Sequence, residues 1–304
     1  MPRSPDRPAL PRLRHRRDLQ SLLYLALAPA LAAWQWRHGF WWPAYLALLF
    51  LTLGIGVIHH NHTHLRMWRG PGARLANRAT DFWITALQGH PTFVFWPAHV
   101  GNHHRYRHGP HDAARTYRFG GDTNHLAGYL THPFQALRAL FPLFLEWLGR
   151  MRRRRPGVWR YCMAQYALWL GLWAGLLALD PAKALLFVIL PQLHGLHWLL
   201  ATNYLQHAHA DGGPDAASRL AYARNFEGWV NPLLFNIGLH TAHHEHPRAH
   251  WTELARLHRD VYRDRVAPGL NERGLAPYML RVFVLGSVVP GLRSRPRMAP
   301  EHVR

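Results

Sequence analysis

The stretch Ala184–Gln206, ALLFVILPQLHGLHWLLATNYLQ, decides the class of fold. Its 23 residues include no Asp, Glu, Lys or Arg, and only His194 and His197 are ionisable. A helix of about 20 residues spans the roughly 30 Å hydrocarbon core of a bilayer. The stretch therefore predicts a transmembrane helix. Because ionisable groups are costly in lipid, both histidines are expected to line an interior surface.

Three further apolar runs have a comparable length. They are Leu19–Trp36, Phe40–Ile58 and Tyr161–Leu179, with 18, 19 and 19 residues. A short tip separates the first run from the second, and another separates the third from 184–206. The sequence therefore predicts an all-α integral membrane protein. Its four transmembrane helices are expected to form two hairpins, with a cytoplasmic helical cap that carries the histidine-rich segments.

Basic residues give the chain a formal net charge of +20 and set the expected topology. Six arginines between residues 3 and 17 precede the first run and six between residues 150 and 160 precede the third, whereas the tips carry little charge. Positively charged segments stay in the cytoplasm, so this distribution favours a membrane topology over nucleic-acid binding. The expected organisation is a basic arm at 1–18, a membrane domain at 19–260 and a basic tail at 261–304.

Four histidine clusters lie next to the apolar runs and between them. They are HNHTH at 60–64, HVGNHH at 99–104, NYLQH at 203–207 and HTAHH at 240–244. The topology puts all four on the cytoplasmic side, although about 180 residues separate the first from the last. Cys162 is the only cysteine, so no thiolate site is expected. The clusters therefore predict one assembled metal site built from imidazoles.

Spacing selects nine of these histidines as metal ligands, since residues at i, i+3 and i+4 share one face of a helix. A first-row metal takes four to six ligands, so nine imidazoles imply two metals, and adjacent histidines are expected to face different ones. Imidazole suits zinc, copper, iron and nickel alike, so ligand type does not choose the metal. The nine are His60, His64, His99, His103, His104, His207, His240, His243 and His244.

Polar residues beside the clusters are candidates to accept the second ring N–H of a ligand and so to orient it. They are Asp112, Asp211, Asn236 and Glu245. The alternative for the two aspartates is a turn role beside Gly and Pro. No catalytic side chain is predicted beyond the metal centre itself.

The boxes at 60–64, 99–104 and 240–244 resemble those of the integral-membrane fatty acid desaturase and hydroxylase superfamily. The resemblance covers residues 40–255, and Asn203–His207 is similar to the motif that supplies one more ligand in alkane hydroxylases. It implies a non-haem di-iron centre that uses O2 to remove hydrogen from an acyl chain. Electrons are then expected from a separate ferredoxin-, rubredoxin- or cytochrome b5-type protein.

The stretch from Asn225 to Trp251 looks most like that of bacterial fatty acid desaturases. The resemblance implies an inner-membrane protein whose N-terminus, histidine boxes and C-terminus are cytoplasmic. The expected partners are the bilayer and an acyl lipid substrate, with no nucleic acid.

Two other functions fit the same residues. A hydroxylase or monooxygenase of a lipid, carotenoid or alkane begins with the same hydrogen abstraction, although Asn61 and Gln206 stand where alkane hydroxylases carry acidic residues. A membrane metal transporter would also use histidines, but transporters place ionisable residues at mid-membrane, whereas these gather at one interface. Desaturation of a lipid acyl chain is therefore the leading hypothesis.

Overall fold

The computed structural model describes residues 10–116, 124–210 and 220–295. Within these ranges the chain is mostly helical, and each of its four strands is two residues long. This agrees with the predicted helical class.

The chain divides into two compact units. The first unit comprises residues 1–93 and 157–196, and the second comprises residues 94–156 and 197–304. The chain therefore passes between the units three times, and helix α8 (Leu190–His207) contributes to both.

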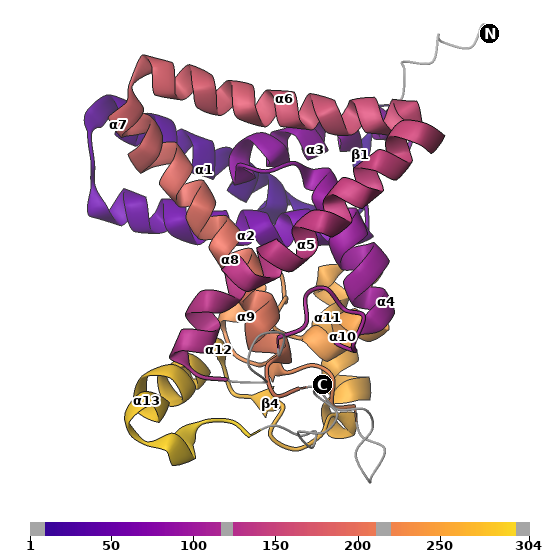
Figure 1. The fold of residues 1–304 in the computed structure, drawn as a ribbon, viewed down its shortest axis with the longest axis vertical. Helices are drawn as coiled ribbons and strands as arrows, with labels where there is room; N and C mark the ends of the chain where they lie inside the picture. The colour runs from indigo at the N-terminus through magenta and orange to yellow at the C-terminus, as the bar shows by residue number, and fades with distance from the viewer. Residues whose placement is uncertain (1–9, 117–123, 211–219, 296–304) are drawn as a thin grey trace, which may run out of the picture. The chain divides into compact units, whose positions relative to one another are not determined.

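Long helices dominate the first unit. α1 (Leu19–His38) and α2 (Trp42–His64) are antiparallel neighbours joined by a short tip, and α3 (Ala73–Gln88) packs beside them (Figure 1). The remaining elements are η1 (Arg16–Asp18), β1 (Arg12–Leu13) paired antiparallel with β2 (Trp68–Arg69), η2 (Thr92–Val94), most of α6 (Pro156–Leu179), α7 (Pro181–Ala184), the π-helix Leu185–Ile189 and the start of α8.

Three helical segments of the described chain are long and apolar enough to cross a membrane: Trp42–His64, Pro156–Leu179 and Pro181–His207. They contain the third and fourth predicted spans and all but the first two residues of the second. The first predicted span, 19–36, forms α1 but is not among the three, since two glutamines, a serine and a proline interrupt its apolar sequence. The predicted count of four spans is therefore reduced to three candidates.

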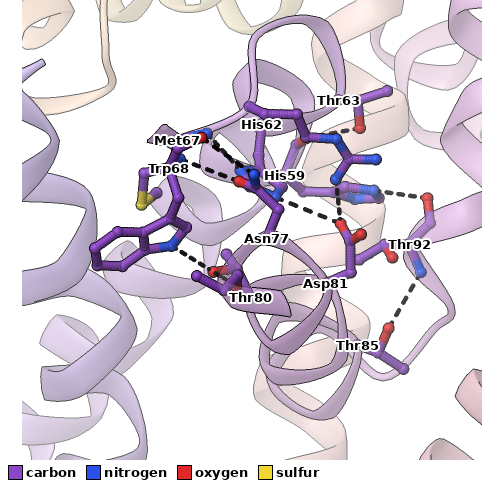
Figure 2. Close-up of polar contacts among 12 residues, drawn as sticks. His59, His62, Thr63, Met67, Trp68, Asn77, Thr80, Asp81, Thr85 and Thr92 are labelled. Atoms are coloured by element: carbon purple, nitrogen blue, oxygen red, sulfur yellow. Dashed lines mark hydrogen bonds and ion pairs between the residues drawn. The ribbon is translucent and has the colours of Figure 1, made fainter. Parts of the chain in front are cut away.

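A buried polar network holds the end of α2 against α3 in the first unit (Figure 2). The Asp81 carboxylate accepts hydrogen bonds from Arg66 at 2.7 Å and from the Tyr161 hydroxyl at 2.8 Å. It also lies 3.6 Å from Nε2 of His62, on the last turns of α2. Burying such groups costs free energy unless they are paired, so these contacts fix the position of the α2 terminus.

The second unit is built from shorter elements around α5 (Leu126–Arg154) and the last turns of α8. β3 (Asn225–Phe226) pairs in parallel with β4 (Asn271–Glu272). The other elements are the π-helix Trp96–His103, α4 (His104–Tyr106), α9 (Val230–Leu233), α10 (His240–Glu245), η5 (Trp251–Glu253), α11 (Leu254–Leu257), the π-helix His258–Tyr262, η7 (Arg263–Arg265), α12 (Leu275–Met279), the π-helix Leu280–Leu285, α13 (Gly286–Val288) and η9 (Pro290–Leu292).

The segment Leu275–Val288, assigned from the sequence to the basic tail, is helical throughout. It buries Tyr278 and Phe283 in the core of the second unit, against Tyr129 of α5 and Tyr204 of α8. This segment is therefore an integral part of the second unit.

Candidate metal centre

Four fully buried histidines of the second unit face one another: His103, His207, His240 and His244. One ring nitrogen from each lies within 4.8 Å of those of the others. Nε2 of His240 is 3.0 Å from Nε2 of His207 and 3.1 Å from Nε2 of His244. We call these four residues the buried quartet.

Three further histidines of the second unit form a second group, which we call the outer trio: His99, His104 and His243. Nε2 of His104 is 3.0 Å from Nε2 of His99 and 3.1 Å from Nε2 of His243. His243 is buried, whereas His99 and His104 are half-buried. The second unit therefore holds two separate sets of converging imidazoles.

A π-helix places the histidines of 99–104 in different groups, His103 in the buried quartet and His99 and His104 in the outer trio. The expected α-helical spacing pairs His99 with His103, but Trp96–His103 is a π-helix, and the N–H of His104 bonds the carbonyl of His99. The wider turn of a π-helix brings residues five apart into register. His104 therefore lies over His99, and His103 turns toward the buried quartet.

The short helix α10 divides its histidines in the same manner. His240 and His244 are four residues apart, share one face and belong to the buried quartet. His243 belongs to the outer trio, so His240, His243 and His244 do not converge on a single point. Adjacent histidines at 103–104 and at 243–244 thus face different groups, as expected for two metals.

Hydrogen bonds to the second ring nitrogen orient two members of the buried quartet. Nδ1 of His103 lies 2.7 Å from a carboxylate oxygen of Asp112, and Nδ1 of His207 lies 2.8 Å from the carbonyl oxygen of Tyr222. Both partners accept, so Nδ1 carries the proton in each ring and Nε2 keeps its lone pair for a metal.

Burial controls the charge of these groups. Burial and then the neighbouring histidines lower the pKa of His244 well below its usual range, so the ring is neutral, which is the form that binds a metal. Burial alone would raise the pKa of Asp112. The contacts with His103 and His108 and the N–H of Ala114 outweigh it and hold that pKa far below its usual range. The quartet therefore holds at least one neutral donor, His244, beside one buried negative charge.

The other predicted orienting residues have different partners. Asn236 donates to the Trp251 carbonyl at 3.1 Å. Glu245 accepts hydrogen bonds from the Tyr222 hydroxyl and from Arg107. Asp211 lies outside the described residues. Tyr222 was missed by sequence reasoning, because the group that bonds His207 is a backbone carbonyl and every residue has one.

His60 and His64 lie in the first unit, on the last turn of α2. They are four residues apart on a continuous helix, as predicted, and their ring centroids are 5.0 Å apart. Nδ1 of His60 lies 3.2 Å from the side-chain oxygen of Asn61. The two rings form a local pair that offers two further ring nitrogens.

Comparison with known families gives one match. The family model described as fatty acid desaturase matches residues 38–274, more than three quarters of the chain, and this range contains all nine predicted ligands. A search of curated proteins found no match.

Proposed function

The chain belongs to the fatty acid desaturase family, and from that premise we propose that it desaturates the acyl chain of a membrane lipid in an O2-dependent reaction. Family membership indicates an oxidoreductase that oxidises lipid at a histidine-ligated metal site. The observation that carries the finer proposal is the pair of imidazole groups in the second unit, the buried quartet and the outer trio.

The donor set fits a pair of transition-metal ions, and iron is the metal that the family resemblance favours. Ring nitrogens face one another at 3.0–3.1 Å, and Nδ1 of His103 and of His207 is already bonded elsewhere. We assign one ion to each group and propose that His60 and His64 supply the remaining ligands. When bound, two irons would supply reduction of O2 coupled to removal of hydrogen from an unactivated C–H bond.

The overall reaction sets what must be delivered to the site. Two C–H bonds of the acyl chain break and a C=C bond forms, which gives up two electrons and two protons. O2 takes these together with two electrons and two protons from outside, and leaves as two water molecules. Because the proposal requires external electrons, it includes a separate ferredoxin-, rubredoxin- or cytochrome b5-type donor.

The protein's own residues have three tasks in this proposal. Asp112 and the Tyr222 carbonyl hold His103 and His207 with Nε2 free of protons, and the Asp112 carboxylate offsets part of the positive charge of an ion in the quartet. Burial of all four quartet rings excludes water from that ion. The candidate span Pro181–His207 ends at His207 of the quartet and would keep the site next to its lipid substrate.

The topology belongs to the same proposal. Three apolar helices and the family support a membrane protein. We propose that α1 acts as a fourth span, so that the spans form two hairpins. With the arginine-rich segments held inside, the N-terminus, the histidine groups and the C-terminus face the cytoplasm of a bacterium.

Lipid profiling of an expressing host tests the proposal. Membranes supplied with a reductase and each class of donor should accumulate acyl chains that have lost two hydrogens, and this product should disappear in His240→Ala. His111→Ala is the matched control, since His111 is exposed and belongs to neither group. Acyl chains that instead gain one oxygen would identify the protein as a hydroxylase. An unchanged lipid profile with every donor would refute the proposed enzymatic activity.

Metal content tests the ligand set separately. We expect about two irons per purified chain, with the iron lowered in His60→Ala and unchanged in His38→Ala, because His38 is exposed and belongs to neither group. Full iron content in a variant that lacks both His243 and His244 would contradict the assignment.

A further inference from the structure

Helix α5 has two apolar faces, of which the fold of the second unit covers one. Its residues Tyr129, Pro133, Ala136 and Leu140 are buried. A second stripe at helical spacing is exposed by 41–73% and consists of Leu126, Leu130, Phe134, Leu137, Phe141 and Leu145. An exposed apolar stripe of this length on one helix indicates a surface that something else covers.

The segment Leu275–Val288 repeats this arrangement. Phe283 stacks on Tyr129 of α5 with ring centroids 4.9 Å apart, so the two helical segments pack against each other within the second unit. The opposite side exposes Leu280, Val284 and Val288 by 53%, 57% and 83%. The whole segment lies beyond residue 274, where the family match ends.

The start of α6 indicates where the C-terminus of α5 lies relative to the bilayer. Arg152, Arg153, Arg154 and Arg155 are exposed at its C-terminus, and α6, a candidate membrane span, begins at the next residue, Pro156. The arginines therefore stand at the boundary between the bilayer and water. A cluster of arginines at that position suits anionic lipid headgroups.

We propose that α5 and the segment Leu275–Val288 lie together in the headgroup region of an anionic bilayer, with their exposed apolar stripes inserted among the acyl chains. Amphipathic helices with basic residues bind membranes in this manner. The charge favours this occupant, because anionic headgroups complement the arginine cluster at the end of α5.

Helix α5 and Leu275–Val288, which we call the platform, are connected to the buried quartet through α8. Tyr278 and Phe283 pack against the turn of α8 that precedes His207. The guanidinium of buried Arg224 lies 4.8 Å from the centre of the Tyr278 ring and donates to the Ala208 carbonyl at 3.0 Å. Insertion of the platform would therefore set the depth of the quartet relative to the lipid.

Depth-dependent fluorescence quenching tests the inference on the full chain. Cys162 is buried, and replacing it with Ala permits a single bimane label at Phe134→Cys, Val284→Cys or, as the control, Arg259→Cys on an exposed polar surface. The protein is reconstituted in vesicles of phosphatidylcholine and phosphatidylglycerol that contain a nitroxide-labelled lipid as quencher. We expect several-fold stronger quenching at 134 and 284 than at 259.

Two results would overturn the inference. One is equal quenching at all three positions. The other is weak lipid quenching at 134 and 284 together with energy transfer between labelled copies, which would identify the occupant as a second chain. The headgroup contact is tested by replacing phosphatidylglycerol with phosphatidylcholine. Quenching at 134 should then fall in the protein that keeps its arginines but not in the Arg152→Gln/Arg154→Gln variant. Quenching that does not depend on the anionic lipid would refute the contact between the arginines and the headgroups.

Discussion

Replacing Asp112 with Asn is the sharpest test of the candidate metal centre. The Asp112 carboxylate is fully buried. Its Oδ2 accepts from Nδ1 of His103 at 2.7 Å and from the N–H of His108 at 2.9 Å, and its Oδ1 accepts from the N–H of Ala114 at 2.8 Å. Asn keeps the volume of the side chain but exchanges one accepting oxygen for a donating NH2 group. Either orientation of the amide therefore leaves a donor facing a donor.

The two orientations harm the site in different ways. If NH2 replaces Oδ2, Nδ1 of His103 must accept, so its proton moves to Nε2, the nitrogen left for a metal. If NH2 replaces Oδ1, the N–H of Ala114 loses its acceptor at a cost of about 1–3 kcal/mol. Loss of a bond that orients a ligand lowers metal affinity about 10- to 100-fold, which corresponds to about 1.4–2.8 kcal/mol.

Competition between purified protein and a chromophoric chelator for a divalent metal measures this change. Glu245→Gln is the matched control, since Glu245 is also a carboxylate of the same unit but bonds Tyr222 and Arg107. We expect the control to bind metal nearly as wild type does. Wild-type affinity together with wild-type stability in the Asp112→Asn protein would refute the role of Asp112 in holding His103.

Three further predictions concern stability, measured as thermal unfolding of the purified protein in detergent. Burial lowers the pKa of His90 to about 4. The neutral ring therefore stabilises the fold fully above about pH 6.5, and this contribution is lost toward pH 4 by about 1.4 kcal/mol per pH unit. His90→Gln should flatten the dependence of stability on pH in this range, and an unchanged dependence would contradict the prediction. A Cβ at Gly195 would meet the Thr52 carbonyl oxygen at 3.0 Å, so Gly195→Ala should cost about 1–3 kcal/mol, whereas Gly171→Ala, with open space around it, should be neutral or stabilising. Asp81→Asn should cost about 1–3 kcal/mol because it replaces one of the two oxygens with which this buried carboxylate accepts hydrogen bonds from Arg66 and Tyr161. Glu146→Gln, at an exposed ion pair, should stay within about 0.5 kcal/mol; equal costs would refute the distinction.

Helical periodicity and apolar length carried most of the correct predictions. Both are local properties, so they predicted the helix that the structure has over Trp42–His64. The same reasoning predicted a span at 19–36, which forms helix α1 and stays a prediction as a membrane span. Its length alone suggested a span, whereas its internal polar residues make it less apolar than the other three.

The arrangement of the metal centre depended on features that no local pattern encodes. Nothing in WPAHVGNH distinguishes a π-helix from an α-helix, yet the wider turn decides that His99 pairs with His104 and not with His103. The carbonyl of Tyr222 reaches His207 only because the chain returns after 15 residues. Leu275–Val288 was assigned to a basic tail because its charge is a local property, whereas its apolar face becomes evident in the packing of the second unit.

The unequal burial of the two histidine groups has a consequence for how long each would retain its ion. An ion in the quartet would be held by four buried rings, and its release would require part of the second unit to open. An ion in the trio borders two half-buried rings, so a chelator can approach without that opening. Loss during purification would then proceed in two kinetic phases, and a preparation that contains one ion per chain would be a partly depleted enzyme with a defined vacant half.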